Sequence, residues 1–223
     1  RQMCIRDREY IGDNAFRDNS NLSHLPSSWS KVKRIGNYAF AYEKIDTLPD
    51  SWGDVEYIGD GAFRENSNIS TLPSSWGKVA YIGNYAFAYE KIKDLPDSWG
   101  EVTTVGLAAF RNNNISELPD SWGKLKKVDE HAFYSNNIKE LPNDWGNLTE
   151  IYESMVDHNP ISTIPKDWGD ITKINKNAFL KNNLPKDLVF TIKPSGLTEE
   201  FVKSLDDSDI PQPVALYLSL IHI

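Results

Sequence analysis

Seven tryptophans recur along the chain at intervals of 23 or 24 residues, and their side chains suit two kinds of role. They are Trp29, Trp52, Trp76, Trp99, Trp122, Trp145 and Trp168. A row of exposed indole rings would stack on the rings of a carbohydrate, whereas a row of buried ones would form a core. Each Trp follows a Leu-Pro or Ile-Pro pair at a fixed distance, which is typical of a core position. We therefore expect a core, with sugar stacking as the alternative.

Side chains that could bind metal or carry out catalysis are few and poorly spaced. His24, His131 and His158 fall at different phases of the chain, without the local spacing of a metal site. The carboxylates of residues 205–211 lack the glycine and the closing glutamate of a calcium loop, which favours a solvated linker. The sequence offers no nucleophile beside a base and no phosphate-binding loop. We expect no metal, no cofactor and no catalytic activity.

The chain is acidic, and this narrows the choice of partners. It has 24 Lys and Arg against 32 Asp and Glu residues, a net charge of -8 at pH 7, and no basic stripe. Nucleic acids and anionic membranes bind positively charged surfaces. No apolar run is long enough to cross a bilayer. We expect neither nucleic-acid binding nor membrane insertion of this chain.

The two ends of the chain differ in character from the rest. Residues 1–7 (RQMCIRD) and 218–223 (LSLIHI) resemble translated sequencing adapter, so we expect both to be non-native. The only cysteine, Cys4, lies in the first of them. Without it the chain has no disulfide, no cysteine nucleophile and no thiolate metal ligand. We also expect that the chain is a fragment whose flanking segments are missing.

An Ala-Phe pair repeats in step with the tryptophans, eleven residues after each of them. Its second member is Phe16, Phe40, Phe63, Phe87, Phe110, Phe133, then Val156 in place of Phe, and Phe179. The consensus is IxxLPxxWGx(V/L)xx(I/V)GxxAF, and residues 8–185 hold seven full units and a broken eighth. Repeats of this period stack as the turns of a solenoid, in which each side chain meets its own kind in the next turn.

Several units resemble a known family. The segments VKRIGNYAF (32–40), VEYIGDGAF (55–63) and VAYIGNYAF (79–87) are similar to the signature of BspA-like leucine-rich repeats, found on bacterial cell surfaces and in some parasitic protists. The segment NNISELPDSWGKLKKV (113–128) also fits the general leucine-rich pattern, with Trp replacing a Leu. The resemblance implies a leucine-rich repeat solenoid of about 23 residues per repeat, with short strands, turns and short helical or 3-10 segments. It also implies a secreted or cell-surface location.

The position of each residue in the unit gives expectations for its environment. One unit should point its apolar residues inward: Ile138, Leu141, Trp145, Leu148, Val128 and Phe133. Leu141 should lie in a short strand that ends at Pro142, because proline cannot donate to a ladder, and Gly146 suits a turn with positive φ. An asparagine precedes the aliphatic position by two residues in four units. Leucine-rich repeats use such a ladder to satisfy turn backbone, here Asn113, Asn136, Asn159 and Asn182.

The repeat breaks down after Asn183, and a segment of different composition follows. Residues 186–217 hold a possible capped helix that starts at Thr198. The segment is either a cap over the end of the solenoid or a linker toward another domain.

A candidate binding face follows from the alternation of side chains. If the Leu of each Leu-Pro pair faces inward, the residue before it faces outward. These positions, called the Leu-Pro row below, are His24, Thr47, Thr71, Asp94, Glu117, Glu140 and Thr163. The row changes from neutral to acidic along the chain, so a partner of the stretch from Asp94 to Glu140 should be positively charged.

Three functions fit these observations. The first is a non-catalytic module that binds a protein or glycan on the Leu-Pro row, in a larger bacterial surface or secreted protein with a role in adhesion or host interaction. The second is a targeting domain of a secreted effector enzyme whose catalytic domain is missing. The third is a structural spacer in a surface stalk.

Overall fold

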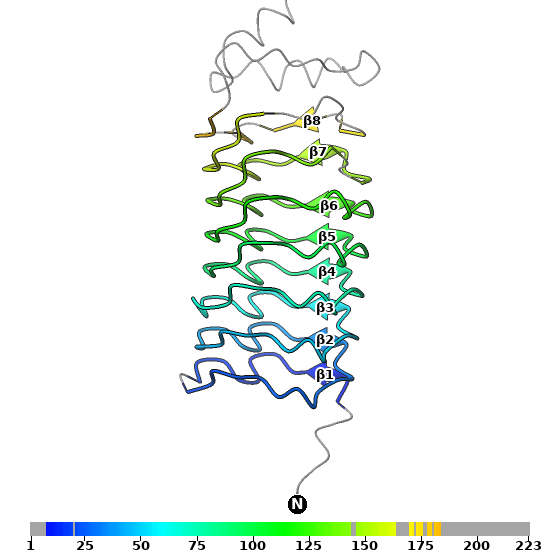
Figure 1. Ribbon diagram of the computed structural model, residues 1–223, viewed down its shortest axis with the longest axis vertical. Coiled ribbons are helices and arrows are strands. Elements are labelled where there is room, and N and C mark those ends of the chain that lie inside the picture. The colour runs from blue at the N-terminus through cyan, green and yellow to red at the C-terminus, as the bar shows by residue number, and fades with distance from the viewer. Residues whose placement is uncertain are drawn as a thin grey trace, which may run out of the picture.

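The chain forms a column of stacked turns with one short strand per turn (Figure 1). The computed structural model describes residues 8–19, 21–143, 146–163, 170–171, 173–175, 178–179 and 181–183. The strands are β1 (Tyr10–Ile11), β2 (Arg34–Ile35), β3 (Tyr57–Ile58), β4 (Tyr81–Ile82), β5 (Thr104–Val105), β6 (Lys127–Val128), β7 (Glu150–Ile151) and β8 (Lys173–Ile174). All pair in parallel, β1 to β6 in one sheet and β7 with β8 in another. The expected repeat solenoid is confirmed.

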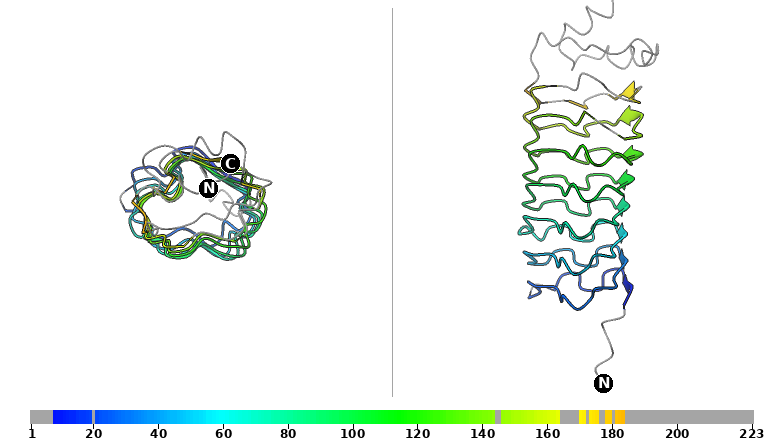
Figure 2. Two further views of the ribbon diagram at one scale, coloured as in Figure 1. Left: turned by 90° about the horizontal axis from the view of Figure 1, so that it is seen from above. Right: turned by 45° about the vertical axis from the view of Figure 1, so that its right-hand side comes forward.

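Viewed along its axis, the column superimposes its turns, so equivalent residues lie above one another (Figure 2). The register shows the same: Ile58 of β3 pairs with Ile82 of β4, 24 residues later. In β1 to β7 the second strand residue is buried and the first is exposed or half-buried. This alternation is what a strand with one face on the core requires.

Two details of the unit differ from expectation. The strands end at the Ile of Ile-Gly or its equivalent and do not lie in the Leu-Pro segment, where an isolated parallel bridge joins His24 and Thr47. A proline without an N–H cannot extend a ladder, so the Leu-Pro segment forms only scattered bonds, such as Ser116 N to Lys93 O at 3.1 Å. In the described part of the chain, turns replace the expected helical segments. Left-handed residues on both sides of Ala-Phe, such as Tyr85 and Tyr89, prevent a helix there.

The tryptophans form a buried stack. Trp99 is fully buried, and its ring centroid lies 6.2 Å from that of Trp76 and 6.5 Å from that of Trp122, with the rings nearly parallel. Its Nε1 donates to the carbonyl oxygen of Pro73 in the preceding turn at 2.9 Å. The core role is thus confirmed for Trp52, Trp76, Trp99 and Trp122, and Trp29 is half-buried. Trp145 and Trp168 lie outside the described residues.

The phenylalanines form a second stack, and the other core positions behave as expected. Successive rings such as Phe87 and Phe110 are 5.5 Å apart and nearly parallel. Val156 fills the seventh place and is fully buried. In the unit chosen for prediction, five residues are buried: Val128, Phe133, Ile138, Leu141 and Leu148. Gly146 has a φ of +62°, as a turn there requires.

The asparagine ladder is confirmed at three of its four expected positions. Asn113 accepts a hydrogen bond from Ile92 N at 3.0 Å and donates to the carbonyl oxygens of Phe87 and Phe110 at 2.8 and 3.1 Å. The same contacts recur at Asn136 and Asn159. Each amide therefore joins three backbone groups from successive turns, which would otherwise be buried without partners.

Two glutamates replace asparagine in this ladder, and the sequence analysis did not identify them. Glu43 and Glu90 are buried at ladder positions, each one turn after a segment with one extra residue. Glu90 accepts hydrogen bonds from Asn66 N at 2.6 Å and Ile69 N at 3.3 Å. The glutamate side chain is longer than that of asparagine, so it reaches the backbone N–H groups of the loop that contains the extra residue. Burial raises the pKa of the Glu90 carboxyl to about 9, although these backbone N–H groups favour the charged form.

Residues 1–7 and 184–223 lie outside the described residues. The expected non-native ends (1–7 and 218–223), the cap or linker (186–217) and the carboxylates of residues 205–211 therefore stay expectations. Within the described part of the chain, we find no helix of the length and hydropathy that a membrane span needs.

We expect Trp99→Ala to lower the free energy of unfolding by about 3 to 5 kcal/mol, as large-to-small core changes do. Trp99→Phe keeps an aromatic ring but removes the bond to Pro73, and should cost less. Urea unfolding followed by circular dichroism measures both. A loss for the alanine variant no larger than that of an exposed substitution would contradict the buried stack.

The first turn should open before the middle of the column. Its aromatic residues Phe16 and Trp29 are only half-buried, whereas their equivalents Phe40 and Trp52 are fully buried. Since each turn of a solenoid contacts only its neighbours, weaker packing lowers local stability. Hydrogen exchange should be fastest between Tyr10 and Trp29. Slowest exchange in that stretch would refute the prediction.

Glu90 should make stability depend on pH. Its folded pKa of about 9 exceeds the ordinary value of 4.5, so folding favours the protonated carboxyl. The contribution is complete below about pH 4.5 and is lost as pH rises toward about 9. Relative to Glu90→Gln, the wild type should therefore lose stability between these limits, as urea unfolding at pH 5, 7 and 9 would show. Glu56→Gln, at an exposed position, should follow the wild type; parallel profiles of wild type and Glu90→Gln would disprove the effect.

Candidate binding face

All seven residues of the Leu-Pro row are exposed, one in each turn: His24, Thr47, Thr71, Asp94, Glu117, Glu140 and Thr163. The leucines that follow them in the chain point into the core. Leu48, Leu72, Leu95 and Leu141 are buried, and Leu118 is half-buried. The backbone of the row is therefore fixed in place, because the adjacent leucines pack into the core.

The acidic part of the row lies beside a shallow hollow. Asp94 and Glu117 line it together with Asp97 and Asp120, which directly follow the proline in the same two turns. The sequence analysis missed Asp97 and Asp120, although the recurring motif LPDSW marks their positions. Four carboxylates from two turns thus share one surface hollow.

A second hollow adjoins the first and has a mixed charge. Lys93 and Lys139 line it together with Asp94, and the polar side chains of Asn114 and Asn137 complete it. A partner of this face would therefore meet acidic groups flanked by two lysines. Its positive groups would have to match Asp94 and avoid the lysines, which gives specificity more than affinity.

The carboxylates of this face are not arranged as a metal site. Asp97 accepts a hydrogen bond from Ser121 Oγ at 3.2 Å, and Asp120 accepts one from Asn143 N at 3.0 Å. Over the residues that the structure describes, no group of three His, Cys, Asp or Glu side chains could hold a metal ion. The face presents a pattern of charge on a rigid support.

A second surface feature was missed by the sequence analysis. Cationic and aromatic side chains follow one another along one corner of the solenoid, one residue per turn. This feature, called the cation–aromatic column below, consists of Arg17, Tyr42, Arg64, Tyr89, Arg111, Tyr134, His158 and Lys181. A signal was available, since Arg17, Arg64, Arg111 and His158 follow one another at intervals of 47 residues.

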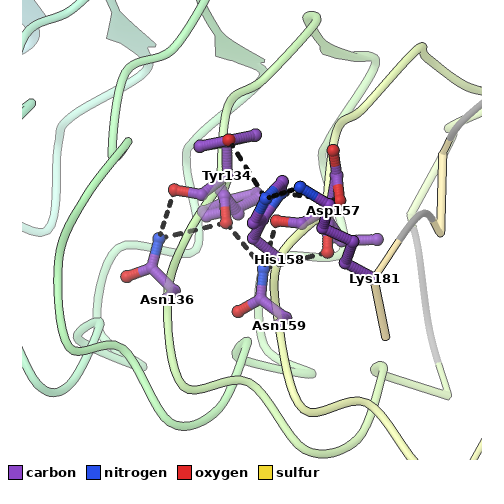
Figure 3. Close-up of polar contacts among 8 residues, drawn as sticks. Tyr134, Asn136, Asp157, His158, Asn159 and Lys181 are labelled. Atoms are coloured by element: carbon purple, nitrogen blue, oxygen red, sulfur yellow. Dashed lines mark hydrogen bonds and ion pairs between the residues drawn. The ribbon is translucent and has the colours of Figure 1, made fainter. Parts of the chain in front are cut away.

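His158 is the centre of a polar cluster in this column (Figure 3). Its Nε2 lies 2.9 Å from Lys181 Nζ and 3.4 Å from the hydroxyl of Tyr134. Its Nδ1 lies 2.8 Å from Oδ1 of Asp157, whose side chain is buried. Of the other two histidines considered for metal binding, His24 is hydrogen-bonded to Ser23 at 2.7 Å, and the ring of His131 packs 5.6 Å from that of Tyr134.

A solenoid with one parallel strand per turn, inward aliphatic residues and an asparagine ladder defines a leucine-rich repeat protein. Comparison with protein families specifies it further. The family described as BspA type leucine rich repeat region matches residues 5–116 and 77–186, with six copies. The chain belongs to this family.

Two solved structures are similar to the chain at low identity. The functional domain of InlJ from Listeria monocytogenes is 12% identical, with a TM-score of 0.39, over 74% of this chain and 43% of that one. A leucine-rich repeat protein of Leptospira interrogans is 16% identical, with a TM-score of 0.44, over 78% of this chain and 48% of that one. The chain thus spans less than half of each. No curated protein matches the chain significantly.

Proposed function

We propose that the chain is a non-catalytic binding module that holds a protein or glycan ligand on the Leu-Pro row. We further propose that it forms part of a larger cell-surface or secreted protein, as is common for BspA-type repeats, and that the ligand's contact surface is positively charged. The family assignment supports a binding role, and the geometry of the row supports this face.

One observation carries the proposal: the row varies while the residues around it stay constant. In three successive turns the exposed residue is Asp94, Glu117 or Glu140, and each lies between a fully buried isoleucine and a core leucine. Because the core determines the backbone of each turn, the exposed residue can change without loss of the fold. Such a surface can be adapted to a partner turn by turn.

The charge of the face sets the kind of partner. Asp94, Glu117, Asp97 and Asp120 line one hollow, so acidic groups outnumber the lysines near it. Exposed charges contribute to the rate of association and to specificity, and salt weakens their effect. A ligand with clustered lysine or arginine residues fits this surface.

We expect the combined substitution Asp94→Asn, Glu117→Gln and Glu140→Gln to weaken binding of a lysine-rich probe such as poly-L-lysine. Three exposed charge pairs at about 0.5 kcal/mol each correspond to about a tenfold loss in affinity. Wild-type binding should also weaken as salt is added. Surface plasmon resonance on the immobilised chain measures both effects.

A matched control removes the same number of charges from exposed positions elsewhere, with Glu56→Gln, Glu130→Gln and Glu153→Gln. The two triple variants have the same net charge, so only the position of the lost charges differs. Equal affinities of the two variants would show that the Leu-Pro row is not the binding face. Circular dichroism establishes that both remain folded.

A further inference from the structure

The cation–aromatic column continues through all eight turns with measured contacts between neighbours at most steps. The guanidinium of Arg17 lies 5.4 Å from the ring centre of Tyr42, and that of Arg64 lies 5.9 Å from Tyr42 and 5.7 Å from Tyr89. Tyr89 N donates to the carbonyl oxygen of Arg111 at 2.8 Å. Side chains of the column thus contact the next turn at each of these steps except that from Tyr89 to Arg111, which only a backbone hydrogen bond joins.

The C-terminal half of the column is the more tightly packed. The Arg111 guanidinium lies 4.6 Å from the ring centre of Tyr134, and the ring of His158 lies 4.6 Å from it in the following turn. Lys181 then contacts His158 at 2.9 Å. Tyr134 is therefore packed between the turns before and after it, and Arg111, Tyr134 and His158 are each half-buried.

The two halves of the column differ in how their cations are neutralised. Arg17 pairs with Asp18 at 3.3 Å, and Arg64 pairs with Glu65 at 3.0 Å. The residue after Arg111 is the uncharged Asn112, and among the described residues the Arg111 guanidinium forms no ion pair. Its Nε is buried without a hydrogen-bond partner.

In the C-terminal half of the cation–aromatic column, the carboxylate of Asp157 is buried. The Asp157 side chain is only 5% exposed and lies against His158 Nδ1, on the opposite side of the imidazole from Nε2. Nε2 and Lys181 Nζ therefore lie on a surface where no carboxylate of the described residues is paired with Lys181. Arg111 and Lys181 are thus cations without a carboxylate partner among the described residues.

From these observations we propose that the stretch Arg111–Tyr134–His158–Lys181 binds an acidic polysaccharide through its carboxylate or sulfate groups. Arg111 and Lys181 would donate to successive anionic groups, and the Tyr134 hydroxyl and His158 would bond to the sugar between them. Guanidinium groups bind carboxylate and sulfate oxygens through paired N–H groups. The inference is independent of the Leu-Pro row.

The spacing and polarity of the column favour a polysaccharide over an acidic peptide. The cations Arg111 and Lys181 lie three turns apart, which is about 15 Å at the spacing of neighbouring strands. A linear polymer with one charge per pair of sugars presents charges at intervals of this order, with hydroxyl groups between them. A bound peptide would need apolar contact at the centre of its interface, and the rings of this column are covered by their neighbours.

The experiment compares four polymers on the full chain: dextran, carboxymethyl dextran, dextran sulfate and poly-L-glutamate. Isothermal titration calorimetry should show binding of one or both charged dextrans and none of neutral dextran. The two charged dextrans distinguish carboxylate from sulfate. The double variant Arg111→Gln with Lys181→Gln should bind about tenfold more weakly, the loss expected for two partly exposed charged contacts.

Two variants control for charge and for folding. Lys124→Gln removes a lysine that is paired with Glu101 at 2.6 Å elsewhere on the surface, and should change the affinity less than about twofold. Arg111→Lys keeps the charge but loses the paired N–H groups, so it should bind more tightly than Arg111→Gln and more weakly than the wild type. Since the net charge of -8 opposes polyanions, binding must come from a local surface.

Three results would overturn the proposal. The first is failure of both charged dextrans to bind more tightly than neutral dextran. The second is an equal loss of affinity in Lys124→Gln and in the Arg111 and Lys181 double variant, which would point to net charge alone. The third is tighter binding of poly-L-glutamate than of either charged dextran, which would assign the column to an acidic protein segment.

Discussion

The hydrogen bond from each buried indole to a proline carbonyl of the preceding turn is the interaction on which the whole solenoid depends. Pro96 shows why: its oxygen accepts from Trp99 N at 3.1 Å in its own turn and from Trp122 Nε1 at 3.1 Å in the next. Both lone pairs of this carbonyl are thereby used. A leucine at the Trp position would fill space but leave one of them unpaired. Leu-Pro and Trp therefore recur together. Their interval also sets the spacing of the residues in the Leu-Pro row and in the cation–aromatic column.

The period, the solenoid, the buried tryptophans and the asparagine ladder could all be predicted, because each repeats in every unit and has one physical purpose. The strands could not be placed, because the Leu-Pro segment and the segment that ends at the Ile of Ile-Gly both alternate apolar and polar residues. Only backbone pairing between turns distinguishes the two segments. A proline such as Pro96 or Pro142 lacks the N–H that a ladder needs, so the strand forms in the segment without proline. The helical segments were expected from the family resemblance. The structure has left-handed residues there instead, and at positions such as Tyr38 and Tyr42 these are not glycine, so the sequence gives no sign of the positive φ.

The exposure of the Leu-Pro row follows from alternation, but its neighbours Asp97 and Asp120 belong to the same hollow only because the backbone bends after the proline. The cation–aromatic column was harder to predict from the sequence, because its members differ in chemical type from one turn to the next. A search at the period of one turn does not find the arginines, because Arg17, Arg64 and Arg111 recur only every 47 residues, which is two turns. Their common property is contact with the turn above and below, which one unit of sequence does not contain. Gly61 gives a local example, since a side chain there would collide with the ring of Tyr38 in the preceding turn.

The pairing of an extra loop residue with a glutamate one turn later restricts how such a chain can grow. The segment IGNYAFAYEKI starts at residue 35 and again at residue 82, so the duplicated block spans two turns. A deletion or duplication of both turns keeps each lengthened loop beside its glutamate. A change by a single turn would place Glu90 opposite a loop without free amides, or leave the amides of Asn66 and Ile69 facing a shorter side chain. Recombination between repeats would thus be tolerated mainly in two-turn steps, and the length of the array would evolve in those increments.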